Sequence, residues 1–258
     1  MFEHISLYAA DPKSQILEQQ QSKKNVPYGL NKIVAVGYDK NKSQCLPSSR
    51  YSLKINVVGL GTAGAVSGIG LAALGHKVIA VDHDQRKVNA LNQGRFSCVD
   101  SQLKALLEQV RRLNNLVASC DLHNAILSTD ITMICIGSSN IQKTTADSDN
   151  MTSIVKQISA TLQSKRNFHL IVICQPTTEA DIQNFIGSDI EHSTGKTLGK
   201  DFGLCFIPLV LSENQALSDF YALPNMTITA SDKRSESLVG KLFNGFNHKI
   251  KYVRYLKM

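Results

Sequence analysis

The sequence predicts an α/β fold, a doubly wound and mainly parallel sheet with helices on both faces. From Tyr51 onward, short apolar runs alternate with segments of helical spacing. The apolar runs are continuous, which is typical of parallel strands that are buried on both faces. A glycine-rich turn joins the first apolar run to the first helix. The 258 residues, 43% of them hydrophobic, are enough for one sizeable core.

The predicted elements follow one another in regular order. Strands are expected at residues 54–58, 77–81, 116–119, 131–136, 169–174, 203–207 and 226–230, with 249–253 as the candidate for a last strand. Helices are expected at residues 65–72, 85–92, 101–112, 121–127, 150–162 and 236–243, and Asp121 caps the fourth of them. Connections between parallel strands of one sheet are right-handed, so these helices should cover the sheet on both sides.

The glycine-rich turn lies between the first strand and the first helix. It comprises Gly59, Leu60, Gly61, Thr62, Ala63 and Gly64. In this G-x-G-x-x-G pattern the first glycine permits the tight turn and the second lets the backbone approach a pyrophosphate. The third lets helix and strand pack closely, and the helix N-terminus offers free N–H groups and a partial positive charge. The turn therefore predicts a dinucleotide site.

A carboxylate ends the second predicted strand, at Asp82. A carboxylate at this position can accept hydrogen bonds from both ribose hydroxyls and repels a 2′-phosphate, so NAD is favoured over NADP as the cofactor. The glycine pattern alone also occurs in ordinary glycine-containing turns. Because the strand, the helix and Asp82 all have the expected spacing, we predict a Rossmann-like dinucleotide-binding domain.

Charge and cysteine usage limit the kinds of ligand and site that the protein is expected to have. The formal charge is +7, but the basic pairs Lys23-Lys24 and Arg111-Arg112 stand alone, which favours a solvated basic surface over a nucleic-acid-binding arm. Such a surface suits an anionic ligand such as a nucleotide. The six cysteines form no C-x-x-C pair, and several lie in apolar runs. We therefore expect reduced, buried thiols rather than disulfides or a metal site.

The ends of the chain add little about function. The N-terminus lacks the basic-then-apolar order of a signal peptide, and no apolar run approaches the ~18 residues that a membrane span needs. We expect a cytoplasmic protein with neither a membrane nor a nucleic acid as partner. Residues 1–50 are expected to be an N-terminal extension or small appended element, with one strand-like run at 32–36. Residues 51–258 are expected to form the NAD-binding domain.

The segment from Asp82 to Gly94 carries the most specific pattern, with Asp82, Lys87-Val88 and Leu91-Asn92-Gln93-Gly94. Further distinctive segments are Ile55 to Gly61, Gly68 to Asp82, Ile134 to Ser139, Asp201-Phe202-Gly203 and Ala216 to Phe220. In these segments the chain resembles the UDP-glucose/GDP-mannose dehydrogenase family. The resemblance covers residues 53–255 and only the N-terminal, NAD-binding domain of that family. A generic Rossmann reductase would share the glycine turn but not the pattern after Asp82.

The resemblance implies a role for several residues. The turn backbone from Leu60 to Ala63 would bind the pyrophosphate, Asp82 would hold the adenosine ribose, and Lys87 would lie near it. Ser138 stands where the family has a threonine that contacts the cofactor. Cys174 stands at the threonine of the family's S-T-V-P loop, so both are carried over as cofactor-binding positions. By residue type alone, Lys87 is equally a solvated charge and Ser138 equally a loop-capping serine.

Departures from the family argue against catalysis. The S-T-V-P loop becomes Ile173-Cys174-Gln175-Pro176, and a thiol at the end of an apolar strand is more often inert core than nucleophile. The first glutamate of the family's N-P-E-F-L-R-E-G is replaced by Leu209, which cannot move a proton. The family's catalytic cysteine belongs to a region beyond Met258, and without it a thioester intermediate cannot form. We therefore predict no catalytic residue in this chain.

These observations favour a chain that binds NAD(H) without oxidising a sugar alone. It would act as a redox-state sensor or as the partner of a full-length or C-terminal dehydrogenase chain. Two alternatives stay open. One is a split nucleotide-sugar dehydrogenase or a simpler hydride-transfer enzyme, and the other is a structural or interaction module with an empty cleft. Whether the chain is an enzyme is not decided by its sequence.

Overall fold

The structure is a computed structural model, which describes residues 51–96, 101–136, 145–174, 186–209, 211–212, 216–221, 227–244 and 252–255. Residues 1–50, predicted to be an N-terminal extension with a strand-like run, lie outside the described residues. The boundary near residue 50 and the extent of the following domain therefore stay predictions.

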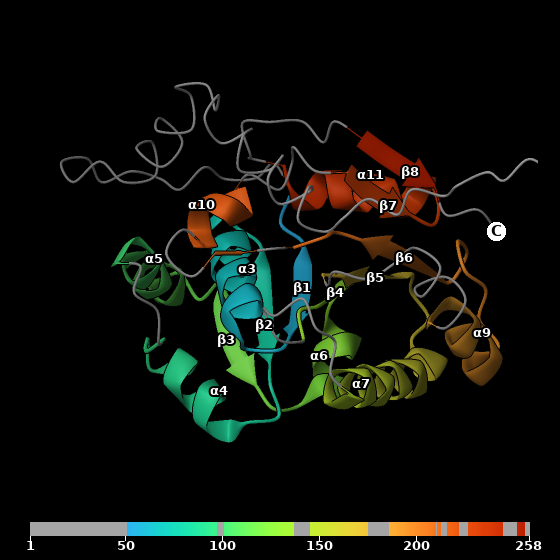
Figure 1. The fold of residues 1–258 in the computed structure, drawn as a ribbon, viewed down its shortest axis with the longest axis horizontal. Helices are drawn as coiled ribbons and strands as arrows, with labels where there is room; N and C mark the ends of the chain where they lie inside the picture. The colour runs from blue at the N-terminus through green and yellow to red at the C-terminus, as the bar shows by residue number, and fades with distance from the viewer. Residues whose placement is uncertain are drawn as a thin grey trace, which may run out of the picture. The chain divides into compact units, whose positions relative to one another are not determined.

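The described residues form one sheet of eight strands (Figure 1). The strands are β1 (Lys54–Val58), β2 (Lys77–Val81), β3 (Leu116–Ser119), β4 (Ile131–Ile134), β5 (His169–Ile173), β6 (Phe202–Phe206), β7 (Thr227–Ala230) and β8 (Tyr252–Tyr255). Their order across the sheet is β3-β2-β1-β4-β5-β6-β7-β8. All neighbours are parallel except β6 and β7. The strand order reverses between β1 and β4, which is the doubly wound arrangement that the sequence predicts.

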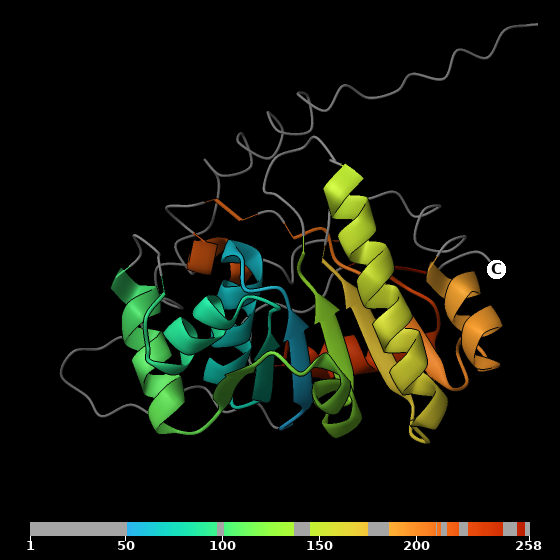
Figure 2. The same cartoon turned by 90° about the horizontal axis from the view of Figure 1, so that it is seen from below.

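Helices cover both faces of this sheet (Figures 1 and 2). They are α3 (Thr62–Ala73), α4 (Gln85–Asn92), α5 (Ser101–Arg112), α6 (Leu122–Ser128), α7 (Thr145–Ser164), α9 (Ser188–Thr194), α10 (Ala216–Tyr221) and α11 (Lys233–Leu242). Helices α3, α4, α5, α10 and α11 bury side chains in one apolar cluster, whereas α6, α7 and α9 bury theirs in a second. In β1, Ile55 and Val57 belong to the first cluster and Val58 to the second. The predicted fold class is thus confirmed.

The strand register brings the carboxyl ends of the central strands to one edge of the sheet. Val58 of β1 pairs with the last residues of β2 and β4. The residues that follow these strands, Gly59, Asp82 and Cys135, therefore meet at this edge. In a doubly wound sheet, the edge beside the reversal of strand order is where a ligand binds.

Most predicted strands agree with the structure to within two residues at each end. Helix α7 begins at Thr145 rather than at residue 150, and α11 begins at Lys233 rather than at 236, because their first turns are polar and carry no apolar spacing. The short helices α9 and α10 were not predicted. For the predicted strand at 249–253, residues 249–251 lie outside the described residues, and β8 begins at Tyr252.

The buried imidazole of His76 ties two layers of the fold together. Its Nδ1 accepts a hydrogen bond from the Leu53 N–H at 3.2 Å, so Nε2 carries the proton and donates to the Leu242 carbonyl at 2.9 Å. Burial lowers the pKa of His76, which keeps the ring neutral. The loop before β2 is therefore fastened both to the start of β1 and to the end of α11.

A second buried histidine, His169, belongs to a polar row inside the sheet. Its Nε2 lies 2.8 Å from the Thr132 hydroxyl, to which the Asn56 side chain also donates at 3.4 Å. All three side chains are fully buried. Burial and the positive charge of Lys165 lower the pKa of His169 to about 3. Lys165 itself donates to carbonyl oxygens at the end of α6.

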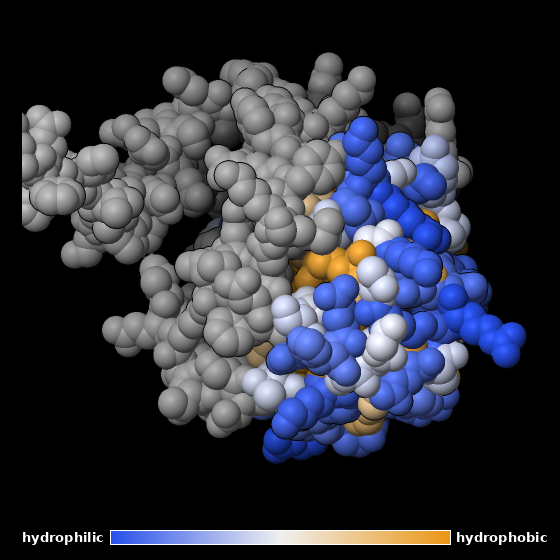
Figure 3. Space-filling model, turned by 90° about the vertical axis from the view of Figure 1, so that its right-hand side faces the viewer, coloured by the Kyte–Doolittle hydropathy of each residue, from blue (hydrophilic) through white to orange (hydrophobic). Residues whose placement is uncertain are grey.

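Figure 3 shows one side of the molecule, where the described surface is mostly hydrophilic with a small apolar area near its centre. Within the described ranges, the exposed large hydrophobic side chains come from separate places along the chain, namely Tyr51, Leu113, Val117 and Leu127. Among the residues that the structure describes, no helix is long and apolar enough to cross a membrane.

Candidate dinucleotide-binding site

The glycine turn leaves the end of β1 and enters α3. Gly59 has a φ of 99°, a left-handed conformation that favours glycine. Its N–H donates to the Val81 carbonyl at 2.7 Å, which extends the pairing of β1 with β2. A Cβ at position 59 would lie 2.7 Å from the carbonyl oxygen of Cys135. The first glycine is therefore required by the backbone conformation and by the close approach of the chain after β4.

The other two glycines of the pattern have different surroundings. A Cβ on Gly64 would lie 1.7 Å from the carbonyl oxygen of Gly59, so α3 can pack on the turn only with glycine at this position. A Cβ on Gly61 would meet nothing within 4 Å among the described residues. Its φ of −73° is open to any residue. Gly61 is therefore not needed by the fold, and its missing side chain leaves open space beside the start of α3.

The first turn of α3 is suited to an anion. Gly61 is the N-cap and supplies no side-chain cap, and the first turn contains no acidic residue. Gly61 and Thr62 are exposed, whereas Gly64 is buried. Neither a capping side chain nor a carboxylate of this turn competes for its N–H groups, which together with the helix dipole fit a pyrophosphate.

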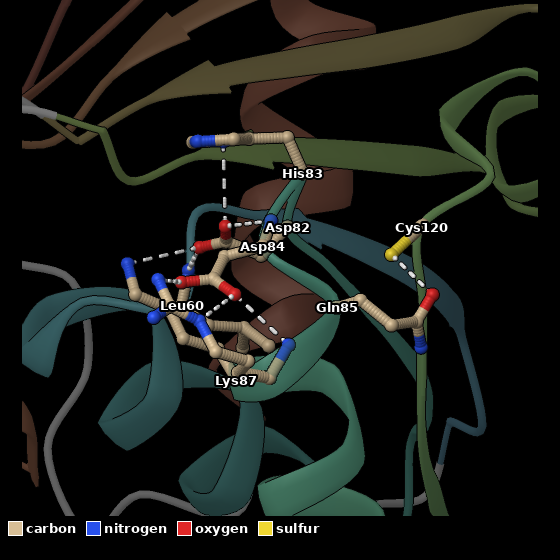
Figure 4. Close-up of polar contacts among 8 residues, drawn as sticks. Leu60, Asp82, His83, Asp84, Gln85, Lys87 and Cys120 are labelled. Atoms are coloured by element: carbon tan, nitrogen blue, oxygen red, sulfur yellow. Dashed lines mark hydrogen bonds and ion pairs between the residues drawn. The ribbon is translucent and has the colours of Figure 1, made fainter.

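The Asp82 carboxylate lies beside this turn, at the end of β2 (Figure 4). Its Oδ2 accepts from the Leu60 N–H at 2.7 Å, and its Oδ1 accepts from the Asp84 N–H at 2.9 Å. Two basic side chains approach the same oxygens: Lys87 Nζ is 3.5 Å from Oδ2, and His83 Nδ1 is 3.4 Å from Oδ1. Asp82 therefore connects the glycine turn to β2, and a ligand can replace its contacts with Lys87 and His83.

The remaining acceptor capacity of Asp82 decides what it can bind. Each carboxylate oxygen has two acceptor sites, one of which is used by a short backbone bond. The Lys87 and His83 side chains are 48% and 95% exposed, and their contacts are long. Two neighbouring hydroxyls can replace these two contacts without breaking the backbone bonds. The carboxylate thus fits a ribose diol, and Lys87 lies next to the carboxylate.

Helix α4 begins close to Asp82, and a different carboxylate, that of Asp84, caps its N-terminus. Asp84 is its N-cap and accepts from the Arg86 N–H at 2.9 Å. The guanidinium of Arg86 lies 3.1 and 3.0 Å from the two oxygens of Asp84, which lowers the pKa of Asp84 to about 2. On the other side of this helix start, the exposed thiol of Cys120 lies 3.3 Å from the Gln85 side-chain oxygen (Figure 4). The start of α4 is thus occupied by an acid and is unsuited to a second anion.

The pattern from Leu91 to Gly94 has a structural role. The Asn92 side chain pairs with the backbone of Ala118 in the edge strand β3, donating at 2.9 Å and accepting at 2.8 Å. Gly94, with a φ of 75°, ends α4: its N–H donates to Leu91, and the next N–H donates to Ala90. The pattern therefore holds α4 on β3 and positions the helix whose start carries Lys87.

The structure brings Gly59 to Gly64, Asp82 and Lys87 together at one edge of the sheet. The predicted contact of Ser138 lies outside the described residues and stays a prediction. Cys174 follows β5, is 4% exposed and packs in the apolar cluster on the α3 side of the sheet. The neighbouring Cys135 thiol and burial raise the pKa of Cys174. Leu209 is 5% exposed and belongs to the same cluster.

Two residues of this site were missed in the sequence. His83 approaches Asp82, and the signal was only its place directly after that residue. Cys135 lies close to Gly59 and Gly64, and the signal was its place near the end of a predicted apolar strand, as for Cys174. Neither signal indicates a contact with the site until the strand register shows which residues lie side by side.

Comparison with known proteins identifies the family of this chain. Residues 53–247 match the model of the UDP-glucose/GDP-mannose dehydrogenase family, NAD binding domain. The chain is 31% identical over 192 residues to the GDP-mannose 6-dehydrogenase of Pseudomonas aeruginosa and 26% identical over 191 residues to the UDP-glucose 6-dehydrogenase of Haloferax volcanii. Each match covers 74% of this chain and 44% of the relative. The chain belongs to the UDP-glucose/GDP-mannose dehydrogenase family as an NAD-binding domain, which confirms the resemblance and the cofactor.

Solved structures agree with the fold. The chain aligns with a ternary complex of GDP-mannose dehydrogenase from P. aeruginosa at a TM-score of 0.72 and 28% identity, over 79% of this chain and 47% of that one. It aligns with a UDP-glucose dehydrogenase from Pyrobaculum islandicum at a TM-score of 0.71 and 24% identity, over 80% and 47% of the two chains. The chain thus spans less than half the length of these proteins.

Proposed function

We propose that this chain binds NAD(H) at the turn from Gly59 to Gly64 and at Asp82, and that it does not oxidise a nucleotide sugar by itself. One observation carries the proposal: Gly61 and Asp82 keep the open space and acceptor capacity that a dinucleotide needs, whereas Leu209 is enclosed in the apolar core. The backbone of the α3 first turn would hold the pyrophosphate, and Asp82 would hold the adenosine ribose. When bound, NAD supplies a hydride acceptor.

Leu209 and Cys174, which stand where the family has a glutamate and a threonine, support the second half of the proposal. Leu209 has no group that can accept or donate a proton. The raised pKa of Cys174 keeps its sulfur protonated, which makes it a poor nucleophile at neutral pH. The cysteines in the described part of the chain, Cys120, Cys135, Cys174 and Cys205, are free thiols, which also supports a reducing, cytoplasmic location.

Such a chain would act as a redox-state sensor or as the NAD-binding partner of a dehydrogenase. Enzymatic activity in a split nucleotide-sugar dehydrogenase is the second candidate function. The identity of 31% with a GDP-mannose 6-dehydrogenase supports it, because it points to a nucleotide sugar as the substrate of the assembled enzyme. An empty structural module is less well supported, because no described side chain fills the space beside Gly61.

Titration of the pure chain with NADH tests cofactor binding at this site. We expect saturable binding and at least a tenfold weaker affinity for Asp82→Asn, whose amide cannot accept two hydroxyl hydrogens at both terminal atoms. Asp130→Asn is the matched control, because Asp130 is exposed and precedes β4 at the opposite edge of the sheet. Thermal melting checks that both variants are folded. Equal affinities for the two variants would place the cofactor elsewhere.

Incubation with NAD and GDP-mannose or UDP-glucose tests the absence of catalysis. We expect no NADH from the chain alone. Adding a chain that carries the rest of a dehydrogenase distinguishes the two candidate functions, since only the split enzyme would then form NADH. Formation of NADH by the chain alone would refute the non-catalytic part of the proposal.

A further inference from the structure

Two buried cysteines lie side by side under the glycine turn. Cys135 follows β4 and Cys174 follows β5, and the last residues of these strands, Ile134 and Ile173, pair in parallel register. The Cys174 N–H donates to the Ile134 carbonyl at 2.9 Å, so the register continues past the strand ends. Cys135 and Cys174 are therefore direct neighbours on adjacent strands.

Both side chains point to the same face of the sheet. Cys135 and Cys174 are 6% and 4% exposed and belong to the apolar cluster on the α3 side. Neighbouring strands lie about 4.8 Å apart, which is within the Cα separation of about 4.4–6.8 Å that a disulfide spans. Cys205 lies in the same cluster but pairs with Val172, which precedes Cys174 by two residues. Cys135 is thus the better placed partner for Cys174.

The same cysteine touches the proposed cofactor turn. The carbonyl oxygen of Cys135 would lie 2.7 Å from a Cβ on Gly59, and its own Cβ would lie 3.3 Å from a Cβ on Gly64. Gly59 and Gly64 also lie close to each other, since a Cβ on Gly64 would lie 1.7 Å from the Gly59 carbonyl oxygen. A displacement of Cys135 therefore reaches the backbone that would hold the pyrophosphate.

We propose that Cys135 and Cys174 form an oxidation site, in which a small peroxide closes a disulfide beneath the glycine turn and weakens cofactor binding. One sulfur, as thiolate, attacks an oxygen of hydrogen peroxide, releases hydroxide and becomes a sulfenic acid. The second thiolate attacks that sulfur, the S–S bond forms, and the sulfenic oxygen leaves as water. The two sulfurs lose two electrons to the peroxide, and the two thiol protons end in the two waters.

The surroundings determine the rate and the consequence of this reaction. The raised pKa of Cys174 makes the reaction slow at neutral pH and faster as the pH rises, because the thiolate is the nucleophile. A disulfide holds its two Cβ atoms about 3.8 Å apart, which is less than the strand spacing of about 4.8 Å, so closing the bond draws Cys135 and Cys174 together. Because β4 lies between β1 and β5, this shift draws Cys135 away from Gly59 and Gly64 and loosens the contacts that hold the turn. Because binding and oxidation are coupled, bound NADH should in turn oppose the crosslink.

Peptide mapping of the full chain tests the crosslink directly. Cys45, Cys98 and Cys120 are replaced by serine, the protein is exposed to hydrogen peroxide, remaining thiols are alkylated, and the digest is analysed by mass spectrometry. We expect a peptide pair joined through Cys135 and Cys174, lighter by two hydrogens and sensitive to reductant. Cys205→Ser should keep this pair, and Cys174→Ser should abolish it. Full alkylation of both cysteines after treatment, or a crosslink to Cys205 instead, would overturn the proposal.

NADH titration of the oxidised and reduced forms tests the consequence. We expect at least a threefold weaker affinity for NADH after oxidation, restored by reductant. Peroxide treatment of Cys174→Ser should leave its affinity equal to that of the same variant before treatment. Unchanged affinity in a fully crosslinked sample would overturn the link to the turn. This part depends on the proposed cofactor site, whereas the crosslink is detected by mass alone. Absence of NADH binding to the reduced protein would therefore count against the proposed function and not against the crosslink.

Discussion

The neutral, buried His169 predicts how the stability of the fold depends on pH. Its pKa is lowered from 6.5 to about 3, chiefly because burial disfavours the charged ring and also because Lys165 is nearby. The unfolded chain therefore binds a proton at this residue near pH 6.5, whereas the folded chain resists protonation down to about pH 3. Stability from this residue is present at higher pH and is lost as the pH falls through the unfolded value.

The magnitude follows from the size of this shift. Each pKa unit is worth about 1.4 kcal/mol, so lowering the pH from about 7.5 to about 5 should remove about 2 kcal/mol of folding free energy through His169. The assay is urea unfolding of the wild type and of His169→Gln at both pH values. Glutamine keeps a polar group near Thr132 but does not titrate.

We expect the wild type to lose about 2 kcal/mol more than His169→Gln between the two pH values. His76, which is also buried with a lowered pKa, contributes in the same direction but equally in both proteins. It therefore cancels in the comparison. An identical loss in wild type and variant would refute the assignment of a neutral, buried His169.

Two packing contacts give further predictions. A Cβ on Gly70 would lie 2.4 Å from the Phe220 ring, so Gly70→Ala should lower the free energy of unfolding by about 1–3 kcal/mol. Adding Phe220→Leu should recover part of this loss. A double-mutant cycle in urea measures the coupling between the two positions, and strictly additive effects would contradict the contact. Asn92→Ala should cost about 1–3 kcal/mol, because both backbone groups of Ala118 lose their partner. Hydrogen exchange at the Ala118 amide should speed up in this variant, and unchanged protection would argue against the two hydrogen bonds between Asn92 and Ala118.

The parts of the fold that the sequence predicts are those governed by local pattern. Continuous apolar runs such as 169–174 indicate strands because burial on both faces excludes polar alternation. The conformation of Gly59 and the place of Asp82 follow from a motif in which neighbours in sequence are neighbours in space. For this reason the fold class, the family and the cofactor are all confirmed.

The parts that the sequence does not predict depend on contacts between distant segments. His169 meets Thr132 and Asn56 only because β5, β4 and β1 lie in one register. The neighbourhood of Cys135 and Cys174 has the same origin. The burial of Leu209 against the α3 side of the sheet also depends on how the chain returns after β6. No local pattern contains this information, because each of these residues is unremarkable in its own segment.

The affinity of Gly61→Ala for NADH tests the central claim most directly. A Cβ at this position meets nothing within 4 Å of the described residues, so the variant should fold and melt like the wild type while its methyl group occupies the space proposed for the pyrophosphate. Gly240→Ala is the matched control, since it is exposed on α11 and its Cβ also meets nothing described within 4 Å. We predict at least a tenfold loss of affinity for Gly61→Ala and none for Gly240→Ala. Wild-type affinity in folded Gly61→Ala would contradict the claim that this turn binds the cofactor.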